Sequence, residues 1–293
     1  MNVSVVGEPL CNRYPAGMTT DDHGSGTGID TTVPHSARIW NYWLGGKDNY
    51  PVDREAGDAW LAVHPEIAVA ARAGRGLLRR GVRYMAGEAG VRQFLDIGTG
   101  LPTADNTHEV AQQVAPDSHV VYVDNDPLIL AHARAMMTST PQGTTHYLDT
   151  DMLDVARLLE LAEEHLDFSR PVGVVFMQVL GHVRTAQEAR HLVHSVMDAM
   201  APGSYLLIAD GVEVEGDEAA QKAQDEYNDS GAAPYLLRPL SDLRSLFDGL
   251  EFVEPGLVSI TQWRPDDTSG LPSIGMSEPE PLKNVFGGLA RKP

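Results

Sequence analysis

Two short segments place acidic side chains and glycines where a strand is expected to end. The first is the run Phe94 to Ile97, which contains Asp96 and leads into Gly98, Thr99 and Gly100. Glycines let a backbone turn sharply and approach a ligand closely, and a helix that follows offers free N–H groups in its first turn. The segment therefore predicts a site for a nucleotide-type cofactor.

The second segment is the apolar run 120–123, which ends at Asp124, 28 residues after Asp96. An acidic residue at this place can accept hydrogen bonds from both hydroxyl groups of a ribose. Turns also favour aspartate, so Asp124 alone would indicate little. Its pairing with the glycine turn, and the helix start expected at residues 125–127, favour the cofactor-binding interpretation.

The charge of Asp96 narrows the choice of cofactor. A dinucleotide-binding turn has the pattern G-x-G-x-x-G/A, whereas this turn continues through Leu101 and Pro102 to Thr103. A carboxylate at Asp96 would repel a pyrophosphate and attract an ammonium or sulfonium group. S-adenosylmethionine carries both groups and is the predicted cofactor. A nicotinamide dehydrogenase is the competing enzyme class, and no metal site is expected.

Further candidate site residues follow the next two expected strands. Asp151 can accept a hydrogen bond from an adenine amino group and Met152 can pack on the ring, although Asp149 or Asp151 could instead cap a helix. The strand 172–177 leads into Gln178 and His182. Imidazole titrates near neutral pH, so His182 is the candidate general base, while a structural or surface role is the alternative for any of the 11 histidines.

The elements that must position these residues alternate in type from residue 91 onward. Each short apolar run is followed by an amphipathic stretch, which predicts a parallel sheet covered by helices on both faces. The expected pairs are 92–97 with 104–115, 119–123 with 127–137, 144–148 with 152–165, 171–177 with 185–200, and 204–210 with 217–228.

The remaining segments predict three regions. Residues 1–28 are polar and glycine-rich without a period, and are interpreted as a disordered leader. Residues 29–90 predict a helical cap, with one helix from 35 to 44 and two more separated at His64-Pro65. Residues 91–293 form the predicted cofactor-binding core, which ends with a helix at 240–250 and strand-like runs at 251–260 and 285–291.

The charge and composition exclude several classes of partner. The chain of 293 residues has 41 acidic and 22 basic residues, a net charge of −19, whereas nucleic acids and anionic membranes require a basic surface. No run is long enough to span a membrane, no secretory signal is seen, and Cys11 is the single cysteine. A cytoplasmic protein with a small-molecule partner is expected, and the oligomeric state is left open.

Together these motifs resemble class I S-adenosylmethionine-dependent methyltransferases, which have a Rossmann-like α/β fold. Several stretches resemble more specifically the bacterial S-adenosyl methyltransferase family once called a domain of unknown function (DUF574). They are Ile29–Arg38, Gly45–Tyr50, Asp53–Glu55, Val253–Leu257 with Trp263–Pro265, and Gly287–Pro293.

The resemblance implies a mostly parallel seven-stranded sheet with an antiparallel last strand, and a helical cap that closes over the cofactor. Trp40 and Trp43 are expected to dock this cap onto the core. The residues expected to contact the cofactor are Asp96, Gly98, Thr99, Gly100, Thr103, Asp124, Asn125, Asp151, Met152 and Gln178, joined through the resemblance by Arg38, Tyr42, Lys47 and Asn49.

The function expected is transfer of a methyl group to the oxygen, nitrogen or carbon of a small molecule. His182 or Tyr50 is the candidate base or positioning residue. The cap residues 29–90 and the loop 211–238 are expected to shape the acceptor site; the loop residues concerned are Glu213, Glu215, Tyr227, Asn228 and Tyr235. A non-catalytic protein that binds the cofactor and regulates or scaffolds a partner is the alternative from another class, because one fold hosts many functions.

Overall fold

A computed structural model describes residues 30–126, 128–129, 139–265 and 280–293. The predicted leader 1–28 and most of the helix expected at 127–137 lie outside these residues. Among the described residues, no helix combines the length and the apolar character needed to cross a membrane.

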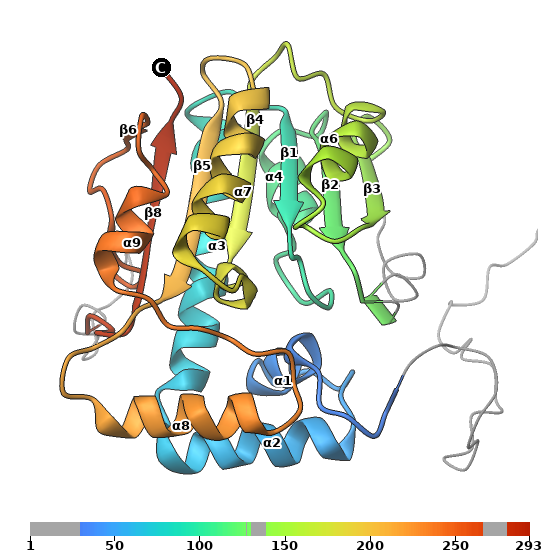
Figure 1. The fold of residues 1–293 in the computed structure, drawn as a ribbon. Helices are drawn as coiled ribbons and strands as arrows, with labels where there is room; N and C mark the ends of the chain where they lie inside the picture. The colour runs from blue at the N-terminus through green and yellow to red at the C-terminus, as the bar shows by residue number, and fades with distance from the viewer. Residues whose placement is uncertain (1–29, 127, 130–138, 266–279) are drawn as a thin grey trace, which may run out of the picture.

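The core of the molecule is one sheet of eight strands in the order β3-β2-β1-β4-β5-β8-β6, with β7 also paired to β8 (Figure 1). Strands β1 to β5 are parallel and β8 runs antiparallel to β5. The predicted fold class is confirmed. The strands are β1 Gln93–Ile97, β2 His119–Asp124, β3 Thr144–Asp149, β4 Val172–Met177, β5 Tyr205–Gly211, β6 Glu251–Phe252, β7 Val258–Ser259 and β8 Val285–Arg291.

The sheet has eight strands rather than the expected seven because its last position is divided. The two-residue strands β6 and β7 both pair antiparallel with β8. Pro255, which has no N–H to donate, and Gly256, at φ 90°, lie between them and interrupt the ladder. Strand β8 therefore lies inside the sheet, between β5 and these two pieces.

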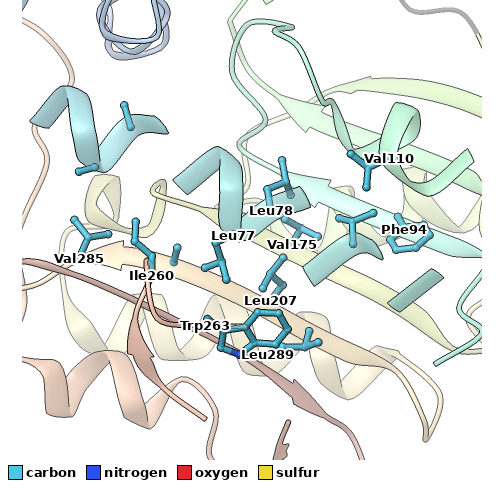
Figure 2. Close-up of a cluster of buried hydrophobic side chains, with 14 of the residues drawn as sticks. Leu77, Leu78, Phe94, Val110, Val175, Leu207, Ile260, Trp263, Val285 and Leu289 are labelled. Carbon is cyan, nitrogen blue, oxygen red and sulfur yellow. The ribbon is translucent and has the colours of Figure 1, made fainter. Parts of the chain in front are cut away.

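Successive side chains of each strand point to opposite faces, and each face has its own core. Phe94 belongs to one core and Leu95 to the other, and the same alternation separates Leu207 from Leu206. Figure 2 shows Phe94 and Leu207 in the first core, with Trp263 inserted from the loop after β7. Both faces are buried at the central strands β1, β4 and β5, which explains their continuous apolar runs in the sequence.

Helices cover both faces of the sheet. Residues of α3 (Ile67–Gly87) and α4 (Thr107–Val114) belong to the first core. Residues of α6 (Val155–Glu163), α7 (Ala186–Ala199) and α9 (Leu240–Ser245) belong to the second. The sheet is thus a rigid platform whose parallel strands all end at one edge.

Three helices lie beyond that edge and form what we call the lid: α1 (Ser36–Trp43), α2 (Pro51–Val63) and α8 (Glu218–Asp229) (Figure 1). Pro51 at the first position of α2 supplies the φ angle that a helix start requires. The break predicted at His64-Pro65 separates α2 from α3. Helix α8 packs on α2, where the Trp60 and Tyr227 rings are 5.4 Å apart, so the lid combines two distant parts of the chain.

Candidate cofactor and acceptor site

A cavity of about 380 Å³ lies between the carboxyl ends of the strands and the lid, within the range of small-ligand sites. We call the part lined by Gly98, Thr99, Gly100, Asp124 and Asp151 the glycine end. The part lined by residues of α2, α8 and the start of β8 is called the aromatic end; its residues are Trp60, His64, Gln224, Tyr227 and Asn284.

The glycine end depends on a turn that joins the two sequence motifs. Gly98 has φ +70°, and a Cβ there would collide with the Val179 side chain, so both its conformation and its surroundings require glycine. The Gly100 N–H donates to Asp124 Oδ2 at 2.9 Å. This hydrogen bond fixes the glycine turn after β1 to the end of β2.

Asp124 also organises the turn that follows it. Its Oδ1 accepts hydrogen bonds from the N–H groups of Asn125 and Asp126 at 2.9 and 3.1 Å. Burial raises the pKa of Asp124, and these backbone N–H groups oppose the rise. The carboxylate is therefore held in one orientation on the cavity wall.

Asp96 lies behind the turn rather than on the cavity wall. It is 5% exposed, and the Thr107 hydroxyl donates to its Oδ2 at 2.6 Å. Burial raises its pKa to about 6, against the opposing effects of Thr107 and Arg75. Since Asp96 does not line the cavity, the structure gives it the position of a support for the glycine turn.

The loop after β3 supplies Asp151 and Met152 to the cavity wall. Asp151 Oδ1 accepts from the Leu153 N–H at 2.9 Å, whereas the N-cap of α6 is Asp154. Asp151 is therefore not the cap of that helix, and Asp149 is exposed and absent from the wall.

The wall between the two ends follows β4. Gln178 has φ +55°, in the left-handed region that non-glycine residues seldom adopt, and it lines the cavity beside Val179. Such backbone strain is concentrated at functional sites. His182 follows four residues later, at the end of the short 3-10 turn η1 (Leu180–His182).

His182 presents one ring nitrogen as a hydrogen-bond acceptor. Its Nδ1 lies 2.9 Å from the Pro234 carbonyl oxygen, and because a carbonyl only accepts, Nδ1 carries the proton. Nε2 then keeps its lone pair. Burial lowers the pKa of His182, which favours the neutral ring, and His182 lines the cavity. The arrangement can accept a proton at Nε2.

Residues 234–238, which we call the strap, hold η1 in place. The Leu236 N–H donates to the Gly181 carbonyl at 2.8 Å, and Arg238 donates to the carbonyls of Leu180 and Val183. A Cβ on Gly181 would collide with the Tyr235 ring. Since the strap follows α8, the position of His182 is tied to the lid.

Tyr235 anchors the strap to the sheet. Its hydroxyl donates to Asp210 Oδ1, and its ring meets His182 edge-on with centroids 5.1 Å apart. Asp210 is the penultimate residue of β5 and 4% exposed. Burial raises the pKa of Asp210 to about 6, and the hydrogen bond from Tyr235 opposes the rise.

The aromatic end is bounded by four rings, which we call the aromatic ladder: Trp40, Trp43, Trp60 and Tyr227. Neighbouring ring centroids are 5.3, 5.9 and 5.4 Å apart, and all four rings line the cavity. Beside them, Asn284 Nδ2 and His64 Nε2 are 2.7 Å apart. An amide N–H₂ only donates, so Asn284 is the donor in this contact.

A family model described as S-adenosyl methyltransferase matches residues 22–293. The chain belongs to this family. It is an S-adenosylmethionine-dependent methyltransferase, and S-adenosylmethionine is its cofactor. No protein with a curated description matches the sequence.

Two solved structures are similar to the methyltransferase over most of their length. A DUF574 family protein from Streptomyces avermitilis MA-4680 is 41% identical, with a TM-score of 0.83, over 90% of this chain and 99% of that chain. A proposed methyltransferase from Thermobifida fusca YX is 37% identical, with a TM-score of 0.79, over 90% of this chain and 97% of that chain.

The glycine end of the methyltransferase fits this cofactor. At Gly100 a Cβ would meet only the Ala37 side chain, at 4.0 Å, so the turn leaves its backbone open to a ligand there, and Asp124 offers acceptors suited to two ribose hydroxyls. Met152 supplies an apolar surface for a purine, beside Asp151. Of the sequence-predicted cofactor residues, the structure brings nine together on the cavity wall: Gly98, Thr99, Gly100, Thr103, Asp124, Asn125, Asp151, Met152 and Gln178.

The predicted residues of the α1–α2 region lie elsewhere, because they build the lid itself. Arg38 forms a buried ion pair with Asp53, at 3.3 Å between Nε and Oδ1, and donates to the carbonyls of Asp30 and Val33. The Tyr50 ring lies beside the Arg38 guanidinium, 5.2 Å from its centroid. Neither Arg38 nor Tyr50 lines the cavity.

The block after α1 is organised around Asn41, which does line the cavity. Asn49 Nδ2 donates to Asn41 Oδ1 at 3.0 Å, and the Asp48 N–H donates to the same oxygen. Tyr42 donates to Asp58 instead, and Lys47 is exposed. Tyr42, Lys47 and Asn49 are therefore outside the cavity wall.

Sequence reasoning missed several residues of the cavity wall. His35 lines it and forms an ion pair with Asp126 at 3.2 Å. His64, Gln224 and Asn284 converge from α2, α8 and the start of β8. Each is a single polar residue with no motif around it, so only the fold could bring them together.

Proposed function

We propose that the methyltransferase transfers a methyl group to the oxygen or nitrogen of a small molecule bound at the aromatic end, with His182 as general base. The observation that carries this is the tautomer of His182. Its Nδ1–H is bound to the Pro234 carbonyl at 2.9 Å, so Nε2 is the acceptor on a residue of the cavity wall. An acceptor that must lose a proton needs such a group.

In this proposal the glycine end holds the cofactor. Asp124 binds the ribose hydroxyls, Asp151 and Met152 bind the adenine, and the turn at Gly98 and Gly100 admits the methionine portion. When bound, S-adenosylmethionine supplies a methyl group whose bonding electron pair stays with sulfur while the acceptor's lone pair forms the new bond.

The chain's own contribution is to position the reactants, exclude water and accept a proton. His182 Nε2 takes the proton from the acceptor's O–H or N–H, and burial keeps the imidazole neutral and ready to do so. The aromatic ladder and the strap enclose the reacting groups, which removes competing water. General bases of this kind contribute about 10²–10⁴ in rate.

Calorimetry with S-adenosylmethionine and S-adenosylhomocysteine tests the cofactor site. Asp124→Ala is expected to weaken binding about 100-fold, because it removes charge-assisted hydrogen bonds and loosens the turn at Gly100. Asp149→Ala is the matched control: this residue pairs with Asp124 in the register of β2 and β3 but is exposed. Equal affinities of Asp124→Ala and the parent protein would sink the proposed site.

Catalysis is tested separately from binding. We expect methyl-labelled S-adenosylmethionine and a metabolite extract to yield a labelled small molecule with the parent protein and none with His182→Ala. Binding of the cofactor without any labelled product would instead support a protein that only binds and regulates.

A further inference from the structure

We propose that the aromatic end binds an uncharged, planar aromatic acceptor, with its reacting hydroxyl or N–H group toward His182. This inference rests on the proposed function, because it identifies the class of molecule that receives the methyl group. It is carried by the rings of the aromatic ladder, the distribution of charge along the cavity wall, and two polar groups of the ladder, one of which is buried without a partner in the described part of the chain.

The aromatic ladder gives the cavity a wall suited to a flat ring. Trp40, Trp43, Trp60 and Tyr227 come from α1, α2 and α8, and consecutive rings meet at angles of 70°, 59° and 82°. Such edge-to-face packing continues favourably into a bound ring, at centroid distances of 4.5–7 Å. A cation cage would instead need several ring faces around one point, whereas here two of the three ring pairs meet edge-on and the pair Trp43–Trp60 is tilted.

Charge is confined to the opposite part of the cavity. Among the described residues that line it, the charged side chains other than histidine are Arg75, Asp124 and Asp151. Arg75 donates to the carbonyls of Ala104 and Asp105, in the loop that continues the glycine turn. The aromatic end thus offers no counter-ion, and burying a charged acceptor there would be costly.

Two polar groups of the ladder could meet a polar substituent of the acceptor. Trp60 is 9% exposed, and its buried Nε1–H has no hydrogen-bond partner in the described part of the chain. Tyr227 is 8% exposed and lines the cavity, and burial raises the pKa of its hydroxyl. Buried polar groups are nearly always hydrogen-bonded, so these two groups favour an acceptor that carries a second polar substituent.

Calorimetry on the full chain saturated with S-adenosylhomocysteine tests the class with four matched probes. They are 2-naphthol, 6-hydroxy-2-naphthoate, 6-(aminomethyl)-2-naphthol and cyclohexanol. We expect 2-naphthol to bind at least tenfold more tightly than the anionic, cationic and aliphatic probes. A charged probe that binds as well as 2-naphthol overturns the uncharged class, and cyclohexanol binding as well overturns the aromatic class.

Variants locate the binding at the ladder. Trp60→Leu is expected to weaken 2-naphthol at least tenfold while S-adenosylhomocysteine binds as before. Tyr84→Leu is the control, because Tyr84 packs on Trp263 in the same core but does not line the cavity. Equal losses of 2-naphthol affinity in Trp60→Leu and Tyr84→Leu would overturn the assignment of the binding site to the aromatic ladder.

A milder change keeps the inference testable if Trp60→Leu fails to fold. Naphthalene-2,6-diol is expected to bind about fivefold more tightly than 2-naphthol, through its second hydroxyl, and Tyr227→Phe is expected to abolish that gain. An undiminished gain overturns the role of Tyr227. Loss of S-adenosylhomocysteine binding by the parent protein would overturn the proposed function instead, so the two failures are distinguishable.

Discussion

The glycine end of the cavity and the wall at His182 each depend on one buried aspartate near the carboxyl end of a strand. Asp96 of β1 is 5% exposed and Asp210 of β5 is 4% exposed. Burial raises the pKa of each to about 6, and each accepts a hydrogen bond from a hydroxyl group, of Thr107 and of Tyr235. Chemically the two supports are nearly the same.

They differ in where the hydroxyl comes from. Thr107 is the first residue of α4, 11 residues after Asp96, so this hydrogen bond is internal to one strand–helix unit. Tyr235 follows the lid helix α8, 25 residues after Asp210. The hydrogen bond from Thr107 to Asp96 joins α4 to the strand before it. The hydrogen bond from Tyr235 to Asp210 joins the strap, which follows the lid helix α8, to the sheet. The glycine end is thus held within the sheet, whereas the wall at His182 depends on contacts with the strap that follows α8.

The largest effect is expected at His182, where the strap and the cavity meet. His182→Ala should lower kcat for methyl transfer to 2-naphthol about 10²–10⁴-fold, because no other group replaces the base. Affinity for S-adenosylhomocysteine should change less than about twofold. In the parent enzyme the rate should fall as pH falls through the pKa of His182, which burial lowers, because the protonated ring accepts nothing.

His191→Ala is the control for that change, since His191 is an exposed histidine of α7. Its kcat should equal that of the parent enzyme. A His182→Ala variant that retains the full kcat and the same pH profile would show that His182 is not the general base.

The next effect concerns the buried charge of Asp210. Its pKa rises from 3.8 in the unfolded chain to about 6 when folded, so the folded state binds more protons between these values. Stability from this group is complete only below the unfolded pKa of 3.8 and is lost as pH rises through 6, by about 3 kcal/mol in all. Asp210→Asn lacks this dependence.

Urea denaturation at pH 4 and pH 7 measures the prediction. The free energy of unfolding of the parent protein minus that of Asp210→Asn should fall by about 2.4 kcal/mol between the two pH values. The same difference for Asp149→Asn, an exposed carboxyl at the end of β3, should stay near zero. A constant difference for Asp210 would mean that its carboxyl is not held in a low-dielectric environment.

The different origins of the hydrogen bonds to Asp96 and Asp210 explain which part of the site could be predicted from the sequence. Asp96, Gly98 and Gly100 are contiguous, and Asp124 follows at the spacing of one strand–helix unit, so a local pattern contains the whole glycine end. Asp210 also ends a predicted strand, but its partner Tyr235 lies beyond a helix whose packing no local pattern specifies. Of the residues expected from the loop 211–238, Tyr227 and Tyr235 line the cavity, whereas Glu213, Glu215 and Asn228 do not, and no contact of this loop was predictable.

A smaller effect should follow from cutting the link between lid and sheet. Tyr235→Phe removes the hydroxyl that donates to the buried Asp210, which should lower the free energy of unfolding by about 2 kcal/mol at pH 8. At pH 5, where Asp210 is mostly protonated, the loss should be smaller. Tyr42→Phe is the matched control, because the Tyr42 hydroxyl also donates to an aspartate, Asp58, but at an exposed position.

Kinetics give this variant a second measurement. If the strap positions His182, kcat of Tyr235→Phe should fall about tenfold while KM for S-adenosylmethionine is unchanged, since the glycine end does not depend on the strap. An equal fall in Tyr42→Phe, or a change confined to KM, would contradict the coupling between lid and base.

Some residues that the family resemblance assigned to the cofactor instead hold the lid together in the structure. Arg38 and Asp53 form a buried ion pair between α1 and α2. Asn49 binds Asn41 and so shapes the wall from behind. A sequence motif shows that such residues occur together, but it gives no distance between them. It therefore cannot distinguish a residue that supports the cavity wall from one that contacts the ligand.

The smallest expected effect tests that distinction directly. Lys47 is exposed and outside the cavity wall, so Lys47→Ala should change the affinity for S-adenosylhomocysteine by less than about twofold, the scale of a surface substitution. Asn41→Ala should weaken it more, because Asn41 lines the cavity and accepts from the Asp48 N–H and Asn49. A large loss in Lys47→Ala alone would mean that the loop after α1 folds onto the bound cofactor, and that the lid, not only the sheet, builds the glycine end.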